Sequence, residues 1–474
     1  GVRLNGFLQN QIIRSNVAGV TGSGVLGPDG SFEFANLLER NVAAVGSFFG
    51  TIRFNNIFEN GLGIDATANQ IIHNNVLARQ TVQSILVNGV NRVFIVNNTV
   101  YNDSLTDPGI SLVNGASEVE LRNNILVTKV GGTGVFIDAT SLSGFFSDYN
   151  NHAAEPGAAL FDIAGTQFFD LLSWQNVDGF DQNSIGTTPA NLFGNNPTFL
   201  GEARWDFEVA QPGAGRRFDS PTVDAADPRV DIGGFAARPN LLTNPGFESG
   251  LAGWTTGGNA AATNFAFSGA FALNGGAGVT AFAEQTVDLV AAGINTALID
   301  ARNLVAVFGA RFRSAMEAAP DSAMLTLTFL GAGGNTLGTE TVMVDPTTDR
   351  WSLEGGRAFL PFGTRSINFR IDLDQNTGPS LDAFADGAFL YVQSESVGTD
   401  QGAFGNTIDD LTRIEGARLR LRQPNMPVAI VVNQSFTLEW DSYNNIENRQ
   451  VRIDIYQDGV EGPELLGTLA AAVA

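Results

Sequence analysis

Short segments of alternating apolar and polar residues recur along the first third of the chain, each too brief for a helix. One set, in which the last three members alternate between inward and outward positions, covers residues 63–64, 84–87, 109–112 and 134–137. A second set covers residues 57–58, 76–77, 99–101 and 125–127. Such segments predict β-strands. Together with the segments that carry the Asn-Asn pairs described next, these sets give three short strands per repeat. Three short strands separated by tight turns are typical of one coil of a parallel β-helix.

Asn-Asn pairs punctuate these strands with spacings of 19, 23, 26 and 27 residues, the range of a solenoid coil. The pairs are Asn55 and Asn56, Asn74 and Asn75, Asn97 and Asn98, Asn123 and Asn124, and Asn150 and Asn151. Asn tolerates the left-handed backbone of a sharp corner, and stacked Asn side chains bond to one another, so a structural Asn ladder is predicted. A leucine-rich repeat is the alternative, but it needs a Leu-dominated consensus. The residues before the pairs (Phe54, His73, Val96, Arg122, Tyr149) have mixed chemistry, and we interpret them as an outward row of ordinary surface.

Residues 1–236 resemble the right-handed parallel β-helix repeat proteins of bacterial exteriors. The similarity lies in 146–150 (FSDYN), Trp174-Gln175, 182–185 (QNSI), 196–199 (NPTF), 205–207, 220–224 and 231–235. Ala225-Ala226 stands where that family usually has Gly. The resemblance implies parallel β-helix coils over 1–152 and a C-terminal closing segment over 153–238.

Residues 239–412 resemble a carbohydrate-binding-module jelly roll. The motif Asn244-Pro245-Gly246-Phe247-Glu248 is followed by Gly253-Trp254, as at the start of such modules. The resemblance implies a structural calcium ion held by Glu248 and Asp386, and oxygen ligands suit calcium. Gly387 stands where the family usually has a second acid, so solvated surface acids are the alternative.

Sugar binding by this jelly roll requires flat aromatic side chains with a polar edge. The chain has 35 Phe but only 5 Trp and 5 Tyr, and Trp254 and Trp351 match core positions of the family. The remaining carbohydrate-binding candidates are Phe265, Phe267 and Tyr391.

Residues 413–474 resemble the first half of an immunoglobulin-like surface domain, with strands expected at 417–421, 436–440 and 451–456. About 60 residues supply too few strands for the roughly seven of a complete sandwich. The predicted fold class is therefore all-β: a right-handed parallel β-helix, a jelly-roll β-sandwich and a partial Ig-like β-sandwich. Both ends of the chain look cut, which suggests a fragment of a longer protein.

The charge and composition of the chain limit the partners and the cellular locations that can be expected for it. Its 49 acidic and 26 basic residues give a net charge of −23, Lys129 is the only lysine, and there is no cysteine. Such a field repels phosphate backbones, so no nucleic-acid partner is expected. No apolar run is long enough for a membrane span. An acidic, cysteine-free β-protein of this kind is expected to be extracellular or on a cell surface.

No catalytic residue is assigned. Arg79, Arg92, Arg122, His73 and Lys129 are the lyase-type candidates, with Asp103, Asp107 and Asp138 as metal ligands, and they form no recognisable cluster. Gly109 replaces the His in the Asp-Pro-His element of alginate epimerases. We therefore predict a non-catalytic structural or adhesive surface protein that is part of a fibre-like or filament assembly, with glycan binding as a further role that the jelly-roll fold permits. A polysaccharide lyase or epimerase acting on acidic polysaccharide is the alternative. Unpaired strand edges also predict self-association or strand exchange between subunits.

Overall fold

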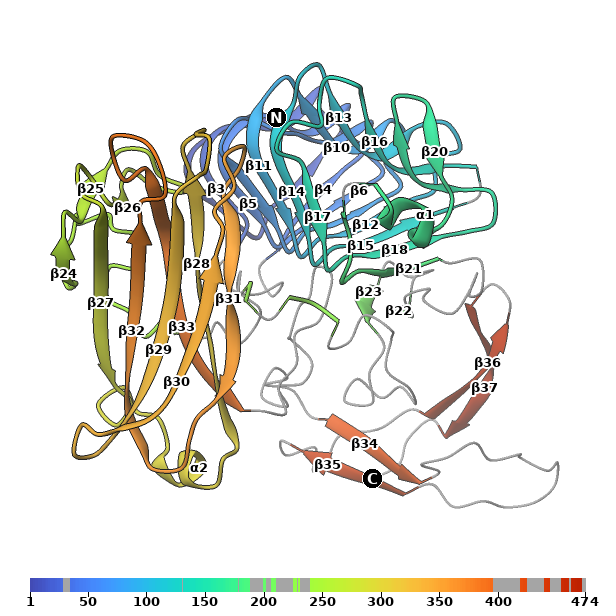
Figure 1. Ribbon diagram of the computed structural model, residues 1–474. Helices are drawn as coiled ribbons and strands as arrows, with labels where there is room; N and C mark the ends of the chain where they lie inside the picture. The colour runs from blue at the N-terminus through green and yellow to red at the C-terminus, as the bar shows by residue number, and fades with distance from the viewer. Residues whose placement is uncertain are drawn as a thin grey trace.

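The computed structural model is built almost entirely of β-strands, so the predicted all-β fold class is confirmed (Figure 1). It describes residues 1–28, 35–129, 131–177, 179–187, 225–227, 229–230 and 239–394, together with six further strands by their backbone alone. Two bodies dominate these residues: a parallel β-helix and an antiparallel β-sandwich. Among the described residues, no helix is long and apolar enough to cross a membrane.

The β-helix consists of three stacks of parallel strands, one strand of each stack per coil. The first stack contains β2 (Ile12–Arg14), β4 (Asn36–Glu39), β6 (Asn55–Phe58), β9 (Val76–Ala78), β12 (Thr99–Asn102), β15 (Ile125–Thr128), β18 (Asn151–Ala154) and β21 (Ile185–Gly186). The second contains β7 (Leu62–Asp65), β10 (Gln83–Asn88), β13 (Pro108–Val113), β16 (Thr133–Ile137) and β19 (Ala159–Ile163). The third contains β8 (Gln70–His73), β11 (Asn91–Val96), β14 (Ser117–Arg122) and β17 (Phe146–Asp148).

The second and third stacks merge in the first coils. The long strand β5 (Ala43–Arg53) pairs with β7 through its first half and with β8 through its second half. It is preceded by β3 (Ala18–Leu26) and β1 (Val2–Leu8), which stack on it in parallel. At this end of the β-helix, one long strand therefore takes the place of a second-stack and a third-stack strand, and the two stacks are separate from β7 onward.

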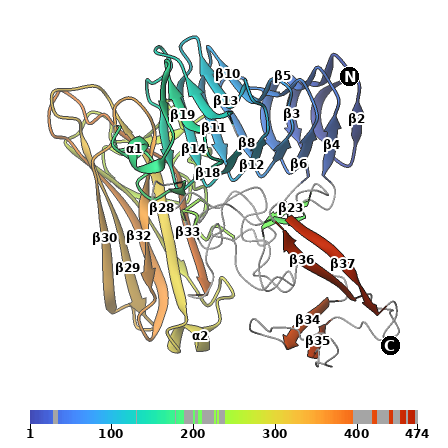
Figure 2. The ribbon, with the colours of Figure 1, turned by 90° about the vertical axis from the view of Figure 1, so that its right-hand side faces the viewer.

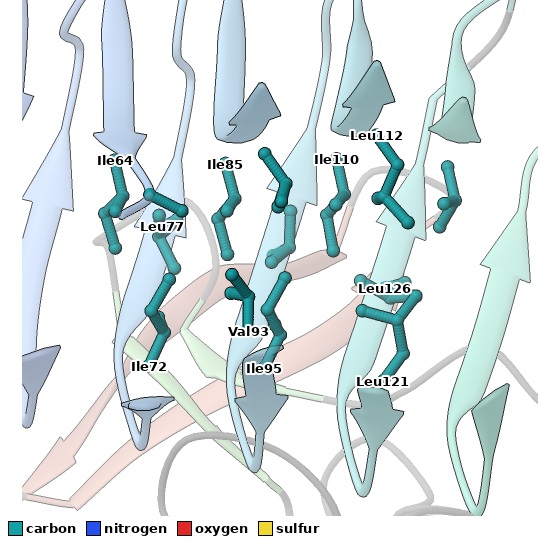
Figure 3. Packing of buried hydrophobic residues seen from close by; sticks show 14 of the residues in the cluster. Ile64, Ile72, Leu77, Ile85, Val93, Ile95, Ile110, Leu112, Leu121 and Leu126 are labelled. Atoms are coloured by element: carbon teal, nitrogen blue, oxygen red, sulfur yellow. The ribbon is translucent and has the colours of Figure 1, made fainter. Parts of the chain in front are cut away.

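Like side chains stack along the interior of the β-helix, because the register of parallel strands places equivalent positions above one another. Ile72 and Ile95 are paired in register, as are Ile64 and Ile85, and all four are fully buried (Figure 3). The same interior contains Leu77, Ile110, Leu112, Leu121 and Leu126. Alternation along each strand leaves the intervening side chains on the outside of the coil.

Aromatic packing closes the C-terminal end of the coils. After β19 the chain turns back through β20 (Thr166–Phe168) into the short helix α1 (Leu171–Gln175), whose N-cap is Asp170. Trp174 is fully buried and stacks on Phe161 with ring centroids 3.8 Å apart. Its indole nitrogen donates a 2.6 Å hydrogen bond to Asp181. The regular parallel pairing therefore extends past residue 152, to β21.

The sandwich contains two five-stranded antiparallel sheets over a shared apolar core. One sheet has the order β24 (Thr255–Gly258), β27 (Thr280–Asp288), β32 (Thr364–Asp374), β29 (Ser322–Gly331) and β30 (Thr336–Val344). The other has the order β25 (Ala261–Thr263), β26 (Ala272–Asn274), β33 (Ala383–Ser394), β28 (Leu304–Ser314) and β31 (Ser352–Phe359). Helix α2 (Thr296–Asp300) lies between β27 and β28 in sequence. The sandwich stands beside the β-helix in both views (Figures 1 and 2).

The remaining strands form three separate antiparallel pairs. They are β22 (Phe199–Gly201) with β23 (Asp206–Val209), β34 (Arg418–Gln423) with β35 (Glu439–Tyr443), and β36 (Ile453–Gly459) with β37 (Gly462–Ala470). Much of the predicted closing segment, including 196–198, 220–224 and 231–235, lies outside the described residues, as does most of the predicted Ig-like domain.

Candidate functional site at the junction of the two domains

One asparagine per coil forms a hydrogen-bonded ladder through the β-helix. The side-chain amides of Asn36, Asn55, Asn75, Asn98, Asn124 and Asn150 are linked in that order by bonds of 2.9–3.2 Å. A second ladder, formed by Asn16, Asn41, Asn60 and Gln80, runs along another corner. The first ladder takes the first Asn of the pairs at 55 and 150 but the second Asn of the other three pairs.

From Asn55 onward, the left-handed corner is formed by the residue before each ladder asparagine. These residues are Phe54, Asn74, Asn97, Asn123 and Tyr149, with φ between 48° and 58°. The predicted outward row is therefore out of register by one residue at its two ends, because Phe54 and Tyr149 occupy corners rather than strand positions. The strand register instead aligns Arg53, His73, Val96, Arg122 and Asp148.

The prediction that this row is ordinary solvated surface is wrong. His73, Val96 and Arg122 are only 4%, 1% and 3% exposed. A second outward row runs beside it through Ile71, Phe94, Glu120 and Phe146. Both rows belong to the third stack of the β-helix, and the sandwich contacts them at Phe94, Val96, Glu120 and Phe146.

Strands β28, β31 and β33 supply the opposing face of the junction. Apolar contacts at its centre join Phe94 and Val96 of the β-helix to Val307, Leu353 and Phe389 of the sandwich. Phe94 also meets Phe267 edge-on, with centroids 4.6 Å apart. The outer face of this sheet is thus packed against the coils.

A buried ion-pair network lies next to this apolar centre. Glu120 accepts a 2.8 Å bond from Arg122 Nε and bonds of 2.5 and 3.1 Å from the two terminal nitrogens of Arg311. Burial by itself would raise the pKa of Glu120, but Arg311 and Arg122 lower it to about 2. Glu120 therefore remains ionised and fixes a sandwich arginine to the β-helix.

Asp227 extends the network on its other side. It accepts a 2.5 Å bond from Arg122 and a two-pronged contact of 2.8 and 2.9 Å from Arg229. Burial opposes ionisation of Asp227, but Arg122 and Arg229 lower its pKa. At the rim of the junction, Glu118 and Arg313 form a separate 2.7 Å pair between the domains.

A cavity of about 210 Å³ opens beside this network. The β-helix contributes Glu120, Arg122 and Phe146, and Arg229 comes from the segment between the domains. The sandwich contributes Thr347, Arg350, Trp351, Ser352, Leu353 and Glu354. The cavity therefore exists only where the two domains meet, and it combines aromatic rings with several polar and charged groups.

Two arginines flank the Phe146 ring. The guanidinium carbons of Arg122 and Arg350 lie 4.7 and 5.1 Å from its centroid. Trp351 is 3% exposed, and its indole nitrogen has no hydrogen-bond acceptor among the described residues. A buried N–H without an acceptor is costly, so Trp351 adds a cost of burial beside the cavity.

The three aromatic residues predicted to bind sugar lie in two different environments: two are at the junction and one is exposed. Phe267 and Tyr391 pack against the apolar centre of the junction and are covered by the β-helix. Phe265 is 41% exposed and meets Phe384 edge-on, with Arg313 5.3 Å from its ring. The three residues therefore do not form one continuous exposed platform. Sequence reasoning did not identify Phe146 and Arg350, because the junction brings them together from distant segments.

The predicted calcium ligands lie close enough for Glu248 to influence Asp386. Burial first, and then Glu248, raise the pKa of Asp386, which is about 6 despite three backbone N–H bonds. Glu248 accepts bonds from the backbone of Ala270 and Phe271. Among the described residues, no third His, Cys, Asp or Glu completes a metal-binding group. The carboxylate pair is suitable for a hard cation, whose remaining ligands would be backbone carbonyls and water.

The candidate catalytic residues of the coils have structural partners and do not converge. His73 bonds to Asn74 at 2.7 Å, Arg79 lies 3.7 Å from Asp103, and Lys129 lies 2.9 Å from Glu155. Arg92 donates to the carbonyls of Ala266 and Phe267 across the junction. Asp107 bonds to Ser104 and Thr106, and Asp138 bonds to Asn114, Thr140 and Ser141.

Comparisons with known proteins give architectural likenesses at low identity. No family model matches the sequence, and no curated protein matches it. Among solved structures, the carbohydrate-binding module TmCBM61 in complex with β-1,4-galactotriose is 20% identical with a TM-score of 0.24, and the match covers 33% of this chain and 99% of that one. The CBM22-1 xylan-binding domain of Paenibacillus barcinonensis Xyn10C is 17% identical, with a TM-score of 0.25 and coverages of 34% and 97%.

A phage protein matches a longer stretch. The enzymatically active domain of tailspike protein 4 from bacteriophage CBA120 is 13% identical with a TM-score of 0.26. That match covers 80% of this chain and 55% of the tailspike chain. The ligands and activities in these names belong to the other proteins.

Proposed function

We propose that this chain is a non-catalytic extracellular surface module that binds a glycan at the junction of its two domains. The observation that carries the proposal is the 210 Å³ cavity, in which Phe146 of the β-helix meets Trp351 and Arg350 of the sandwich. Sugars present C–H faces that pack on aromatic rings and hydroxyl groups that bond to charged and polar side chains. This cavity offers both kinds of contact.

The rigidity of the junction supports a structural role as well. Glu120 with Arg311 and Glu118 with Arg313 are ion pairs between the domains, and apolar contacts accompany them. Fixed domains keep a binding site preorganised, which lowers the entropy lost on binding. Attachment to a larger fibre or filament, and self-association by strand exchange, remain predictions that rest on the sequence.

A polysaccharide lyase or epimerase is the alternative function. Such an enzyme needs a base beside the bound sugar and a group that neutralises a uronate. The arginines of the cavity match the second requirement. Of the residue types that serve as such a base (Lys, Arg, His or Tyr), the described lining of the cavity contains only arginine. Arg122 and Arg229 are held charged by Asp227, which favours binding over turnover.

Binding of saccharides to the intact chain tests the proposal directly. We expect calorimetry to detect mono- or oligosaccharide binding and Phe146→Ala to weaken it at least tenfold. Phe282→Ala is the matched control, because Phe282 also lies under an arginine, with Arg370 3.8 Å from its centroid, but outside the cavity. Absence of binding to a broad glycan panel would contradict the proposal. Release of unsaturated oligosaccharides would replace it with the lyase function.

We also propose that Glu248 and Asp386 hold a structural calcium ion in the sandwich. Two oxygen-donor side chains close enough to interact, one of them fully buried, support it. A cation there would offset their mutual repulsion and the cost of burying Asp386.

A further inference from the structure

Some of the hydrogen-bonding groups that line the junction cavity already have partners within the protein, and others do not. Glu120 already accepts bonds from Arg122 and Arg311 through both of its carboxylate oxygens. The hydroxyls of Thr347 and Ser352 donate to the carbonyls of Arg350 and Phe312. The two hydroxyls therefore have no donor left for a ligand, and Glu120 has little acceptor capacity left.

Among the described residues that line the cavity, the accessible donor with the weakest existing partner is Arg350. The Trp351 indole N–H has no acceptor among the described residues, but it is buried and so not accessible to a ligand. The Arg350 guanidinium has five N–H groups, and its ion-pair partner Asp349 lies 3.6 Å away and is itself 48% exposed. A ligand that enters this cavity is therefore required mainly to accept hydrogen bonds.

The charged side chains that line the cavity also favour a ligand that accepts hydrogen bonds. Arg122, Arg229 and Arg350 face Glu120 and Glu354, three positive groups against two negative ones. Asp227 and Asp148 offset the charge on Arg122, but neither lines the cavity. Asp227 also pairs with Arg229, so Arg350, whose partner Asp349 lies 3.6 Å away, is the least neutralised of the three cations that line the cavity.

We infer that the cavity binds a single acidic sugar residue, with its carboxylate at Arg350 and its ring against Phe146. Arginine matches the planar carboxylate through two parallel bonds, and this geometry distinguishes it from lysine. Glu354 remains as an acceptor for a sugar hydroxyl. The volume of 210 Å³ lies below the roughly 300–1,000 Å³ of pockets for drug-sized ligands, which suits one sugar unit rather than a chain segment. The inference rests on the proposed glycan binding and specifies its ligand class.

Matched acidic and neutral sugars test this ligand class. We expect glucuronate or galacturonate to bind the intact chain at least tenfold more tightly than glucose or galactose. Sodium acetate, as a free carboxylate, is expected to bind far more weakly than either uronate. Arg350→Gln should remove the preference for acidic sugars, so that the ratio of uronate affinity to neutral-sugar affinity falls from at least tenfold to about one, whatever its effect on the neutral sugars alone. Arg350→Lys should restore only part of the preference, because it keeps the charge but loses the planar fork.

Controls separate this inference from the proposed function. Arg370→Gln removes an arginine that also lies over a phenylalanine, on the other sheet of the sandwich, and should change nothing. Equal binding of acidic and neutral sugars would overturn the inference and keep the proposed function. Acetate binding as tight as uronate binding would reduce the site to a carboxylate site, and no binding at all would overturn both. Thermal unfolding of each variant shows whether a loss reflects the site or the fold.

Discussion

At the scale of single residues, the asparagine ladder explains why the repeat is visible in the sequence. Asn98 accepts bonds from the backbone and side-chain amides of Asn75, and its own amide donates to the carbonyls of Ile72 and Val96 and to Asn124. Such a side chain uses all its polar atoms in a buried corner. Asp, Leu or Ser cannot reproduce this set of bonds, so the position recurs as Asn.

Changing one ladder asparagine tests this account. Asn98→Asp keeps the size but removes the donors and adds a buried negative charge that faces two carbonyls. We expect the free energy of unfolding to fall by about 3 kcal/mol or more, since each unsatisfied buried group costs roughly 1–3 kcal/mol. Urea denaturation provides the measurement.

Asn88→Asp is the control for this change. Asn88 is exposed, and its side-chain oxygen, which the substitution retains, accepts the bond from Asn114. A change of no more than about 0.5 kcal/mol is expected there. Equal losses at both positions would show that the ladder bonds contribute little.

Arg122 shows where reading of the sequence fails at this scale. Its position before an Asn pair predicted a solvated side chain, yet it is 3% exposed and bonded to Asp227, 105 residues away. The repeat determines which residues point outward. Whether an outward residue meets water or a second domain depends on contacts far apart in sequence, and no local pattern encodes them.

At the scale of elements, short-range patterns predicted strands and turns well but missed the register at the ends of the repeat. The Asn pairs identified the coils, and Phe54 and Tyr149 then displaced the alignment by one position because they occupy left-handed corners usually taken by Asn. Bulky residues seldom adopt this backbone. The alignment of Phe54 and Tyr149 with the corner asparagines of the other coils is therefore evident only from the stacked strands.

The loop that contains Glu248 and strand β33, which contains Asp386, would together form the proposed calcium site. Calcium at about 100 times its dissociation constant should stabilise the sandwich by about 2.7 kcal/mol, raising its melting temperature, and a chelator should reverse the effect. Glu248→Gln and Asp386→Asn should each abolish the calcium response, because each removes a charged ligand.

The control for the calcium prediction is Asp288→Asn. Asp288 also accepts two backbone N–H bonds, from Val290 and Ala291, but is exposed at the surface. Its variant should respond to calcium as the unaltered chain does. A calcium response that survives both ligand substitutions would assign the ion to another place.

At the scale of the whole molecule, the junction joins two β-architectures that each have their own hydrophobic core. Apolar contacts supply its centre, and the network of Glu120, Arg122 and Arg311 supplies its orientation. Burying charges is costly, so such networks contribute geometry more than net stability, and loss of one partner is strongly destabilising. The same network forms a wall of the cavity, which links the domain arrangement to the proposed binding site.

The pH dependence of stability follows from Glu120. Its pKa is lowered to about 2 in the folded chain, against an ordinary value of 4.5. A carboxyl with a lowered pKa contributes stability that is present above pH 4.5 and is lost as the pH falls toward 2. Glu120→Gln should therefore reduce the free energy of unfolding by about 3 kcal/mol at pH 7, because it leaves Arg311 and Arg122 without their shared partner.

Below pH 4.5 the difference between Glu120→Gln and the unaltered chain should shrink, because Glu120 then takes up a proton when the chain unfolds and this proton uptake favours the unfolded state. Urea denaturation at pH 7, 5, 4 and 3 measures this gap, and Glu59→Gln provides the reference for an exposed pair, with Arg40 as its partner 3.0 Å away. That exposed pair should contribute at most about 1 kcal/mol at any pH. A gap for Glu120→Gln that stays constant from pH 7 to pH 3 would mean that the ionised carboxylate is not what holds the sandwich to the β-helix.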